Sequence, residues 1–212
     1  MSTIILLAAL AVAALIWVET RGPRVLAWLF KPLAATCFVL LAIDSGALLS
    51  SYGQWLLAGL ALSWLGDVLL IPDGEKYFKA GLVSFLLGHV MYIVAFSQLP
   101  LATLLLYLGL ALAIALGALS WRWLRPHLDR AMRLPVALYV AVICTMVTVA
   151  TAVANSPLGY AVAIGGWGFA LSDLAVARQQ FVRPAASNRL WGTPLYFAAQ
   201  MLLALTPLWV SA

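Results

Sequence analysis

The stretch GDVLLIPDGEKYFKAGLVSFLLGHVMY, residues 66–92, carries the features from which the rest of the chain can be interpreted. It joins the end of one apolar segment to most of the next across a polar turn, Pro72-Asp73-Gly74. Asp67 and His89 lie within these apolar segments. A carboxylate in hydrocarbon costs several kcal/mol unless it is paired, hydrated or protonated, so an aspartate at this position indicates a functional site.

The composition is that of an integral membrane protein. Of the 212 residues, 65% are apolar and only 9% are charged, whereas soluble domains have about 25% charged residues. We therefore expect an all-α membrane protein in which residues 1–212 form one integral membrane domain. The net charge of +5 is explained by membrane topology, so we do not expect binding to nucleic acid.

Eight apolar segments are each close to the length needed to cross a hydrocarbon core of about 30 Å as a helix. The predicted transmembrane helices are 3–18, 25–43, 53–71, 79–98, 101–119, 134–154, 158–177 and 190–210. All twelve Lys and Arg residues fall in or close to the first, third, fifth and seventh loops. The positive-inside rule predicts that these loops are cytoplasmic and that the N and C termini are extracytoplasmic. The expected location is the cell membrane, which in a Gram-negative bacterium is the inner membrane.

Two aspartates share a predicted depth. Asp67 and Asp173 each lie about one helical turn inside the cytoplasmic boundary, in the third and seventh segments. The sequences around them, LGDVLL at 65–70 and LSDLAV at 171–176, resemble each other. This similarity suggests two related four-helix halves that meet at the aspartates. Other segments bring further polar side chains into the same half of the membrane: Lys31, Ser84, Tyr139 and Tyr196, with His89 and Gln200 deeper.

A pair of intramembrane carboxyl groups can perform acid–base chemistry. Two such groups in a low-dielectric site do not both ionise easily, so one is expected to keep its proton while the other stays charged. We therefore predict that Asp67 and Asp173 are catalytic. The alternative is that each is a structural acid, paired with Lys31 or hydrogen-bonded to hydroxyl groups, with no chemistry.

The neighbouring polar residues also have two interpretations. His89 is either a hydrogen-bonded core histidine or a proton shuttle that orients an aspartate. Lys31 either extends to the membrane interface or pairs with an aspartate or a substrate phosphate. We do not expect a metal site, because Cys37 and Cys144 lack ligand spacing and His127 lies in a basic loop.

Several short motifs, taken together and in order, resemble the YhhN family, which includes the animal lysoplasmalogenases. These motifs are Lys31-Pro32, Gly66-Asp67, Phe78, Gly81-Leu82, Phe85, Gly88-His89, Tyr92, Pro135 to Tyr139, Ser172-Asp173, Tyr196 and Ala199-Gln200. The resemblance implies a multipass hydrolase, and we expect no cofactor because its chemistry requires neither a metal nor a covalent nucleophile. It would cleave the vinyl ether bond of a lysophospholipid, the lysoplasmalogen, within the membrane lipids and release a fatty aldehyde and a glycerophospho-base.

The residues can be matched to this chemistry, which needs a proton donor, a nearby negative charge and one activated water. One of Asp67 and Asp173 would be the general acid and the other the ionised partner. The expected supporting residues are His89, Tyr139, Tyr196 and Gln200, which would orient the pair, relay protons or hold the water. The expected substrate contacts are Lys31, Ser84, Tyr92 and Ser172. A hydrolase of another lysolipid, a proton-coupled transporter and a lipid-binding or assembly protein remain open alternatives.

Overall fold

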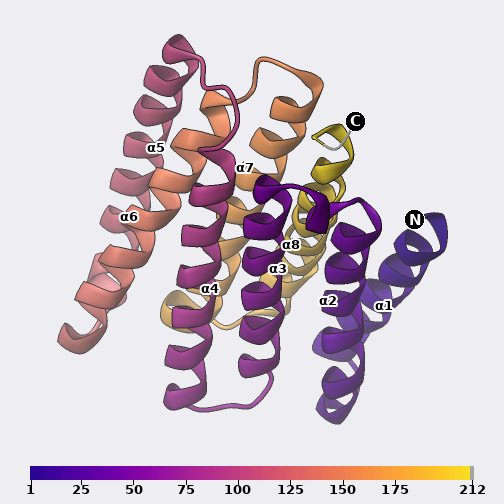
Figure 1. Cartoon of the computed structure of the whole chain (residues 1–212). Helices are drawn as coiled ribbons and strands as arrows, with labels where there is room; N and C mark the ends of the chain where they lie inside the picture. The colour runs from indigo at the N-terminus through magenta and orange to yellow at the C-terminus, as the bar shows by residue number, and fades with distance from the viewer. Residues whose placement is uncertain (211–212) are drawn as a thin grey trace.

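The computed structural model describes residues 1–210, and almost all of them are helical (Figure 1). Within that range the α-helices are α1 (Ser2–Thr20), α2 (Ala27–Asp44), α3 (Ser51–Leu69), α4 (Glu75–Phe96), α5 (Thr103–Leu124), α6 (Arg130–Ala152), α7 (Pro157–Ala177) and α8 (Ala186–Leu205). A π-helical turn, Arg178–Val182, continues α7. No strand forms between residues 1 and 210.

Local sequence signals begin three of these helices. The side chains of Ser50, Asp129 and Ser156 accept hydrogen bonds from backbone N–H groups in the first turns of α3, α6 and α7, at 3.1, 2.8 and 3.0 Å. These bonds satisfy donors that have no partner inside the helix. Gly46 adopts a left-handed conformation, with φ of 86°, shortly after the end of α2. Only glycine adopts this conformation without steric cost.

Six helical ranges are long and apolar enough to cross a membrane by length and composition. They are Ser2–Thr20, Arg24–Asp44, Glu75–Phe96, Thr103–His127, Arg130–Ala152 and Pro157–Val182. Helices α3 and α8 fall outside this set, and these are the helices that carry Asp67, Tyr196 and Gln200. The chain is thus a multi-pass helical membrane protein, whereas the crossing of the membrane by all eight helices stays a prediction.

The fifth loop differs most from its prediction. The predicted helices 101–119 and 134–154 leave the charged stretch 121–133 as a loop. In the structure α5 continues to Leu124, a short 3₁₀ turn covers Arg125–His127, and α6 begins at Arg130. The charged residues extend the two helices beyond their apolar parts. One side of this extension is apolar, and it packs against Phe78, Phe181 and nearby residues through a buried cluster of Leu124, Leu128, Met132 and Val136.

The basic loops lie together at one end of the bundle. The Arg24 guanidinium of the first loop donates to Asp73 of the third loop at 2.7 Å. Arg189, after the seventh loop, donates to the backbone carbonyl of Glu19 at the end of α1, also at 2.7 Å. The apolar cluster around Leu124 joins the fifth loop to the same end. We call this the basic end.

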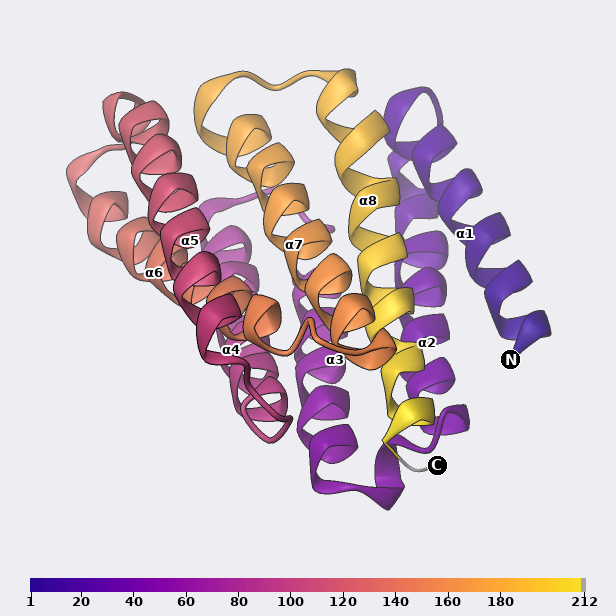
Figure 2. The ribbon, with the colours of Figure 1, turned by 90° about the horizontal axis from the view of Figure 1, so that it is seen from above.

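The opposite end holds the N-terminus, the second loop and the end of α8. The N-terminal ammonium group of Met1 lies 2.9 Å from Asp44, and the hydroxyl groups of Tyr52 and Thr206 are hydrogen-bonded at 2.6 Å. The separation of the two ends agrees with the alternating direction of successive helices in both views (Figures 1 and 2). Which end faces the cytoplasm stays a prediction, as do the two related halves.

Small residues allow the site-bearing helices to approach closely. A Cβ atom on Gly66 would lie 2.7 Å from the Phe85 ring of α4, and one on Gly192 of α8 would lie 2.3 Å from the Cβ of Ala175 in α7. Such contacts leave no room for a larger residue, as is typical of helix packing in membranes. Gly66 therefore lets α3 pack tightly on α4 at the level of Asp67.

Candidate active site

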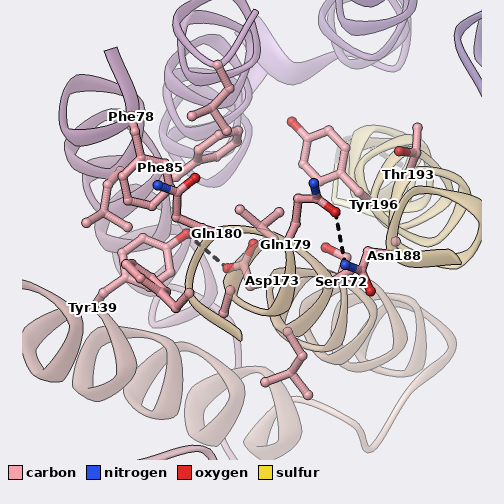
Figure 3. Close-up of a pocket in the computed structure, with 18 of the residues that line it drawn as sticks. Phe78, Phe85, Tyr139, Ser172, Asp173, Gln179, Gln180, Asn188, Thr193 and Tyr196 are labelled. Carbon is pink, nitrogen blue, oxygen red and sulfur yellow. Dashed lines mark hydrogen bonds between the residues drawn. The ribbon is translucent and has the colours of Figure 1, made fainter. Parts of the chain in front are cut away.

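A cavity of about 810 Å³ extends from the basic end of the bundle to both aspartates. Its mouth is lined by the loop residues Arg24 and Asp73 and by Arg189 in the first turn of α8, and its walls are formed by helices α2 to α8. Six of the ten predicted site residues line it: Lys31, Asp67, Tyr139, Ser172, Asp173 and Tyr196. Figure 3 shows the part of this cavity around Asp173.

Asp67 is held by partners from α2 and α8. Its side chain is 3% exposed, and its Oδ2 accepts a hydrogen bond from the Tyr196 hydroxyl at 2.7 Å. The Lys31 ammonium nitrogen lies 3.8 Å from the other carboxylate oxygen, Oδ1. A nearby ammonium group and a hydroxyl donor both favour the ionised form of a carboxyl group, against the cost of burying its charge.

Asp173 has a different set of partners. The Tyr139 hydroxyl of α6 donates to Asp173 Oδ2 at 2.9 Å, as the dashed line in Figure 3 shows. The Nε2 atom of His89 lies 3.6 Å from the same oxygen. No Lys or Arg side chain within the described range forms an ion pair with Asp173. Asp173 therefore shares its environment with an imidazole and a phenol and lacks a permanent cation.

The hydrogen bonding of His89 identifies its tautomer. Its Nδ1 lies 2.7 Å from the backbone carbonyl oxygen of Phe85, which can only accept, so Nδ1 carries a proton. The side chain is fully buried, with the Phe169 ring centroid 4.3 Å away. Nε2 has no hydrogen-bond partner among the described residues and faces Asp173. A proton between Nε2 and the Asp173 carboxyl group would satisfy both.

A chain of polar groups supports Asp67 from behind the cavity. The Tyr92 hydroxyl donates to the Gln200 side-chain oxygen at 2.9 Å. The Gln200 nitrogen lies 3.5 Å from the Tyr196 hydroxyl, which in turn donates to Asp67. Gln200 and Tyr92 are fully buried and do not line the cavity. Gln200 therefore contacts Tyr196 rather than the space in which a reacting water would lie.

Two predicted substrate contacts lie outside the cavity lining, and a third uses its hydroxyl elsewhere. Ser84 and Tyr92 do not line the cavity; the Ser84 hydroxyl donates to the Leu62 carbonyl at 2.7 Å and so joins α4 to α3. Ser172 lines the cavity, but its hydroxyl donates to the Phe169 carbonyl at 2.7 Å. With Tyr92 bonded to Gln200, all three hydroxyl groups donate to other groups of the protein in this structure.

The residues at the cavity mouth were not singled out as site residues from the sequence. Gln179 accepts a hydrogen bond from Asn188 at 2.9 Å, which ties the π-helical turn to α8 (Figure 3). Thr193 donates to the Glu19 carboxylate at 2.9 Å. From the sequence these residues are only parts of loops and helix ends. They come close to one another because of how α1, α7 and α8 pack. Their polarity near a basic loop was the only available signal.

The residues that could bind a metal ion are dispersed. No group of three or more His, Cys, Asp or Glu side chains within residues 1–210 is arranged to hold a metal ion. Cys37 and Cys144 are not joined by a disulfide. Among the predicted site residues, those that line the cavity offer carboxyl, hydroxyl, phenol and ammonium groups, and the His89 imidazole adjoins Asp173 from outside the lining.

The fold and the site together define a class: a multi-pass helical membrane protein in which buried carboxyl groups line a cavity open at one end of the bundle. Residues 26–206 match the model of the YhhN family. The chain belongs to this family.

The chain is similar to several characterised and uncharacterised relatives. Lysoplasmalogenase TMEM86A from Homo sapiens is 34% identical over 200 residues, which cover 90% of this chain and 82% of that protein. Lysoplasmalogenase TMEM86B from Rattus norvegicus is 34% identical over 202 residues, covering 92% and 78%. The uncharacterized membrane protein YhhN from Escherichia coli O157:H7 is 38% identical over 113 residues, covering 49% and 53%. No solved structure matches the chain significantly.

Proposed function

We propose that this chain is a membrane-embedded ether hydrolase that cleaves the vinyl ether bond of lysoplasmalogens to a fatty aldehyde and a glycerophospho-base. The names of the relatives that match about 90% of the chain support this reaction. One observation supports the mechanism: Asp67 and Asp173 line the same cavity, and their partners differ. Asp67 lies beside a lysine, whereas Asp173 lies beside a histidine.

The reaction needs one proton and one water. Protonation of the alkenyl carbon farther from the ether oxygen gives an oxocarbenium ion, in which the positive charge is shared by oxygen and the adjacent carbon. Water adds to that carbon and loses a proton, and the resulting hemiacetal collapses to an aldehyde and the glycerol hydroxyl. The first proton is recovered, so the net reaction consumes one water. A site must therefore combine an acid with a fixed negative charge.

In our proposal Asp173 is the general acid. Because His89 Nδ1 donates to the Phe85 carbonyl, a neutral His89 presents Nε2 as an acceptor toward Asp173 at 3.6 Å. One proton held between these two groups can reside on either, and Asp173 is the member that lines the cavity. After transfer of the proton to substrate, Tyr139 would stabilise the Asp173 carboxylate through its 2.9 Å hydrogen bond.

Asp67 would be the ionised partner. Lys31 and Tyr196 keep it charged, so that it stabilises the oxocarbenium ion and accepts a proton from the attacking water. Lys31 balances this charge when the site is empty. The proton accepted by Asp67 must return to Asp173 before the next turnover, through water in the cavity that both carboxyl groups line.

The proposed membrane arrangement follows from the position of the cavity. All eight helices would cross the bilayer, with the basic end in the cytoplasm and both termini on the other side. The lysolipid would then enter from the cytoplasmic leaflet, and its phosphate would meet Arg24 and Arg189 at the mouth, with Lys31 farther inside. Helices α3 and α8, the less apolar ones, would cross the bilayer as inner helices that face the polar cavity.

The direct test uses purified protein in detergent with a lysoplasmalogen and its saturated ether analogue. We expect aldehyde, trapped as a hydrazone, in equal amounts with the glycerophospho-base, and no product from the saturated analogue. An exposed carboxylate at the opposite end, Asp44, provides the control variant Asp44→Asn, which should keep full activity.

Other outcomes would identify the alternatives. Release of fatty acid from an acyl lysolipid, without aldehyde from the vinyl ether, would indicate a hydrolase of another lysolipid. Proton-driven flux in liposomes without any product would indicate a transporter. Either result would exclude the proposed reaction.

A further inference from the structure

Residues of α5 and α6 line an apolar groove. These two helices lie on the side of the bundle away from α1 and α2 (Figures 1 and 2). The groove has a volume of about 450 Å³ and includes exposed residues of both helices, such as Ile114 and Ala141. Along α5 it extends from Leu110 to Trp121, which corresponds to about 16 Å at 1.5 Å per residue. The groove is thus long and narrow and opens on the lipid-facing surface.

The groove adjoins the cavity that holds the aspartates. Val140 and Cys144 belong to the lining of both. On the cavity side of these two residues the wall is apolar, with Leu116 and Ile143. Opposite them, Gly117 has no side chain, and a Cβ there would lie 2.9 Å from the Cys144 sulfur. The absence of a side chain at position 117 keeps the boundary between groove and cavity thin.

The hydroxyl and thiol groups of the groove donate hydrogen bonds to the helix backbones. The Thr145 and Thr148 hydroxyls donate to the carbonyls of Ala141 and Cys144, at 3.0 and 2.7 Å. The Cys144 thiol donates to the Ala113 carbonyl of α5 at 3.2 Å. With these hydroxyl and thiol donors already used, and with most of its other lining residues apolar, the groove offers an occupant mainly van der Waals contacts, which suits a hydrocarbon chain and not a polar headgroup.

We propose that the α5–α6 groove binds the single hydrocarbon chain of the substrate and is the lateral route by which this chain enters the cavity from the bilayer. The assignment rests on the proposed function for the identity of the chain, an alkenyl group. The headgroup would occupy the mouth at the basic end, and the reacting double bond would lie beside Asp67 and Asp173. Movement of Val140 and Cys144 would open the route.

The first experiment narrows the groove. In Ala141→Phe a ring would fill it, whereas in Ala115→Phe the same change affects an exposed alanine of α5 outside the groove lining. We expect Ala141→Phe to raise KM for a hexadecenyl lysoplasmalogen by about tenfold or more, the scale on which apolar pockets discriminate by shape. KM for an octenyl substrate and kcat for both should change little, and Ala115→Phe should resemble the wild type.

A second measurement does not depend on the folding of a variant in the groove or on turnover. Cys37 is 2% exposed, and Cys37→Ala leaves Cys144 as the sole thiol of the two cysteines. We expect the saturated ether analogue of the substrate to slow the alkylation of Cys144 by N-ethylmaleimide by about tenfold at about ten times its Kd. Glycerophosphocholine, which has a headgroup but no chain, should not slow it.

The two proposals can fail separately. If the wild type releases no aldehyde but the analogue protects Cys144, and Ala141→Phe removes this protection, the proposed reaction is wrong and the groove is a chain-binding site. If aldehyde is released but Ala141→Phe behaves like Ala115→Phe and Cys144 is not protected, the groove proposal is wrong. Disulfide cross-linking between two copies through Ala141→Cys, in a protein with no other cysteine, would also overturn it, because the groove would then be a subunit interface.

Discussion

Asp67 and Asp173 occupy similar positions in α3 and α7, yet the structure surrounds them differently. Asp67 has a lysine at 3.8 Å and a tyrosine at 2.7 Å, whereas Asp173 has a histidine at 3.6 Å and a tyrosine at 2.9 Å. A lysine is a permanent cation, but a histidine can hold or give up a proton near neutral pH. The comparison teaches that similar sequence contexts can receive different partners, because these partners come from other helices.

The largest effect is expected for Asp173→Asn, which removes the proposed acid but keeps the shape of the side chain. We expect kcat for aldehyde release to fall about 1,000-fold, within the roughly 10²–10⁴-fold contribution of general acid–base catalysis. KM should change little. The measurement is steady-state kinetics with purified protein, with Asp44→Asn as control. A kcat within about tenfold of wild type would contradict the role of Asp173.

Asp67→Asn is expected to have a smaller effect, because it removes charge stabilisation but leaves the proton donor. A fall in kcat of about 100-fold matches the loss of one preorganised electrostatic contact. A double-mutant cycle with Lys31→Met sharpens the assignment. Removing Lys31 should cost much less activity in Asp67→Asn than in the wild type, since the two groups act as a pair. Equal losses in both backgrounds would show that Lys31 acts independently of Asp67.

His89→Gln tests the other side of the comparison. We expect kcat to fall about 30-fold, less than the roughly 100-fold that a misplacement of about 1 Å can cost, because Asp173 can still donate its proton. The solvent isotope effect should change, which a purely packing role would not produce. In double mutants, His89→Gln should lower kcat much less in the Asp173→Asn background than in the wild type, and by the same factor as in the wild type in the Asp67→Asn background. The reverse pattern would mean that the roles of the two aspartates are exchanged.

The smallest effects are expected for the tyrosine hydroxyls. Tyr139→Phe and Tyr196→Phe each remove one hydrogen bond to a carboxylate, and we expect a fall in kcat of about fivefold, equivalent to about 1 kcal/mol. Tyr139→Phe should lower kcat less in the Asp173→Asn background than in the wild type, and Tyr196→Phe should lower it less in the Asp67→Asn background. Thermal unfolding in detergent provides the stability control. A loss as large as that of Asp173→Asn would make a tyrosine the proton donor instead.

Much of the fold could be predicted from hydrophobic length alone. The eight predicted segments correspond one to one with α1–α8, because an apolar run of the right length must form its hydrogen bonds internally and so becomes a helix. The prediction was weakest at residues 121–133, where charge indicated a loop. Charged residues at a helix end do not prevent helix formation, and Asp129 begins α6 with a capping bond.

Candidate site residues could be selected from the sequence, but the direction in which each side chain faces could not. Asp67, His89 and Asp173 could be chosen as candidates because an ionisable group in an apolar segment is energetically unfavourable. Gln200 was expected to hold water, but it lies behind Tyr196, and Ser84 bonds to the α3 backbone. Depth along a helix can be counted from the sequence, whereas the direction in which a side chain faces depends on how the helices are rotated against each other.

The sequence by itself determined that the chain is helical, that it lies in a membrane, and that its basic loops alternate, because these follow from hydrophobic length and from charge counted along the chain. Only the tertiary structure decided which cation or imidazole meets which aspartate, and that Val140 and Cys144 separate a polar cavity from an apolar groove. The physical reason is that membrane helices associate through close packing and few hydrogen bonds, so their relative rotation is set by contacts between distant segments.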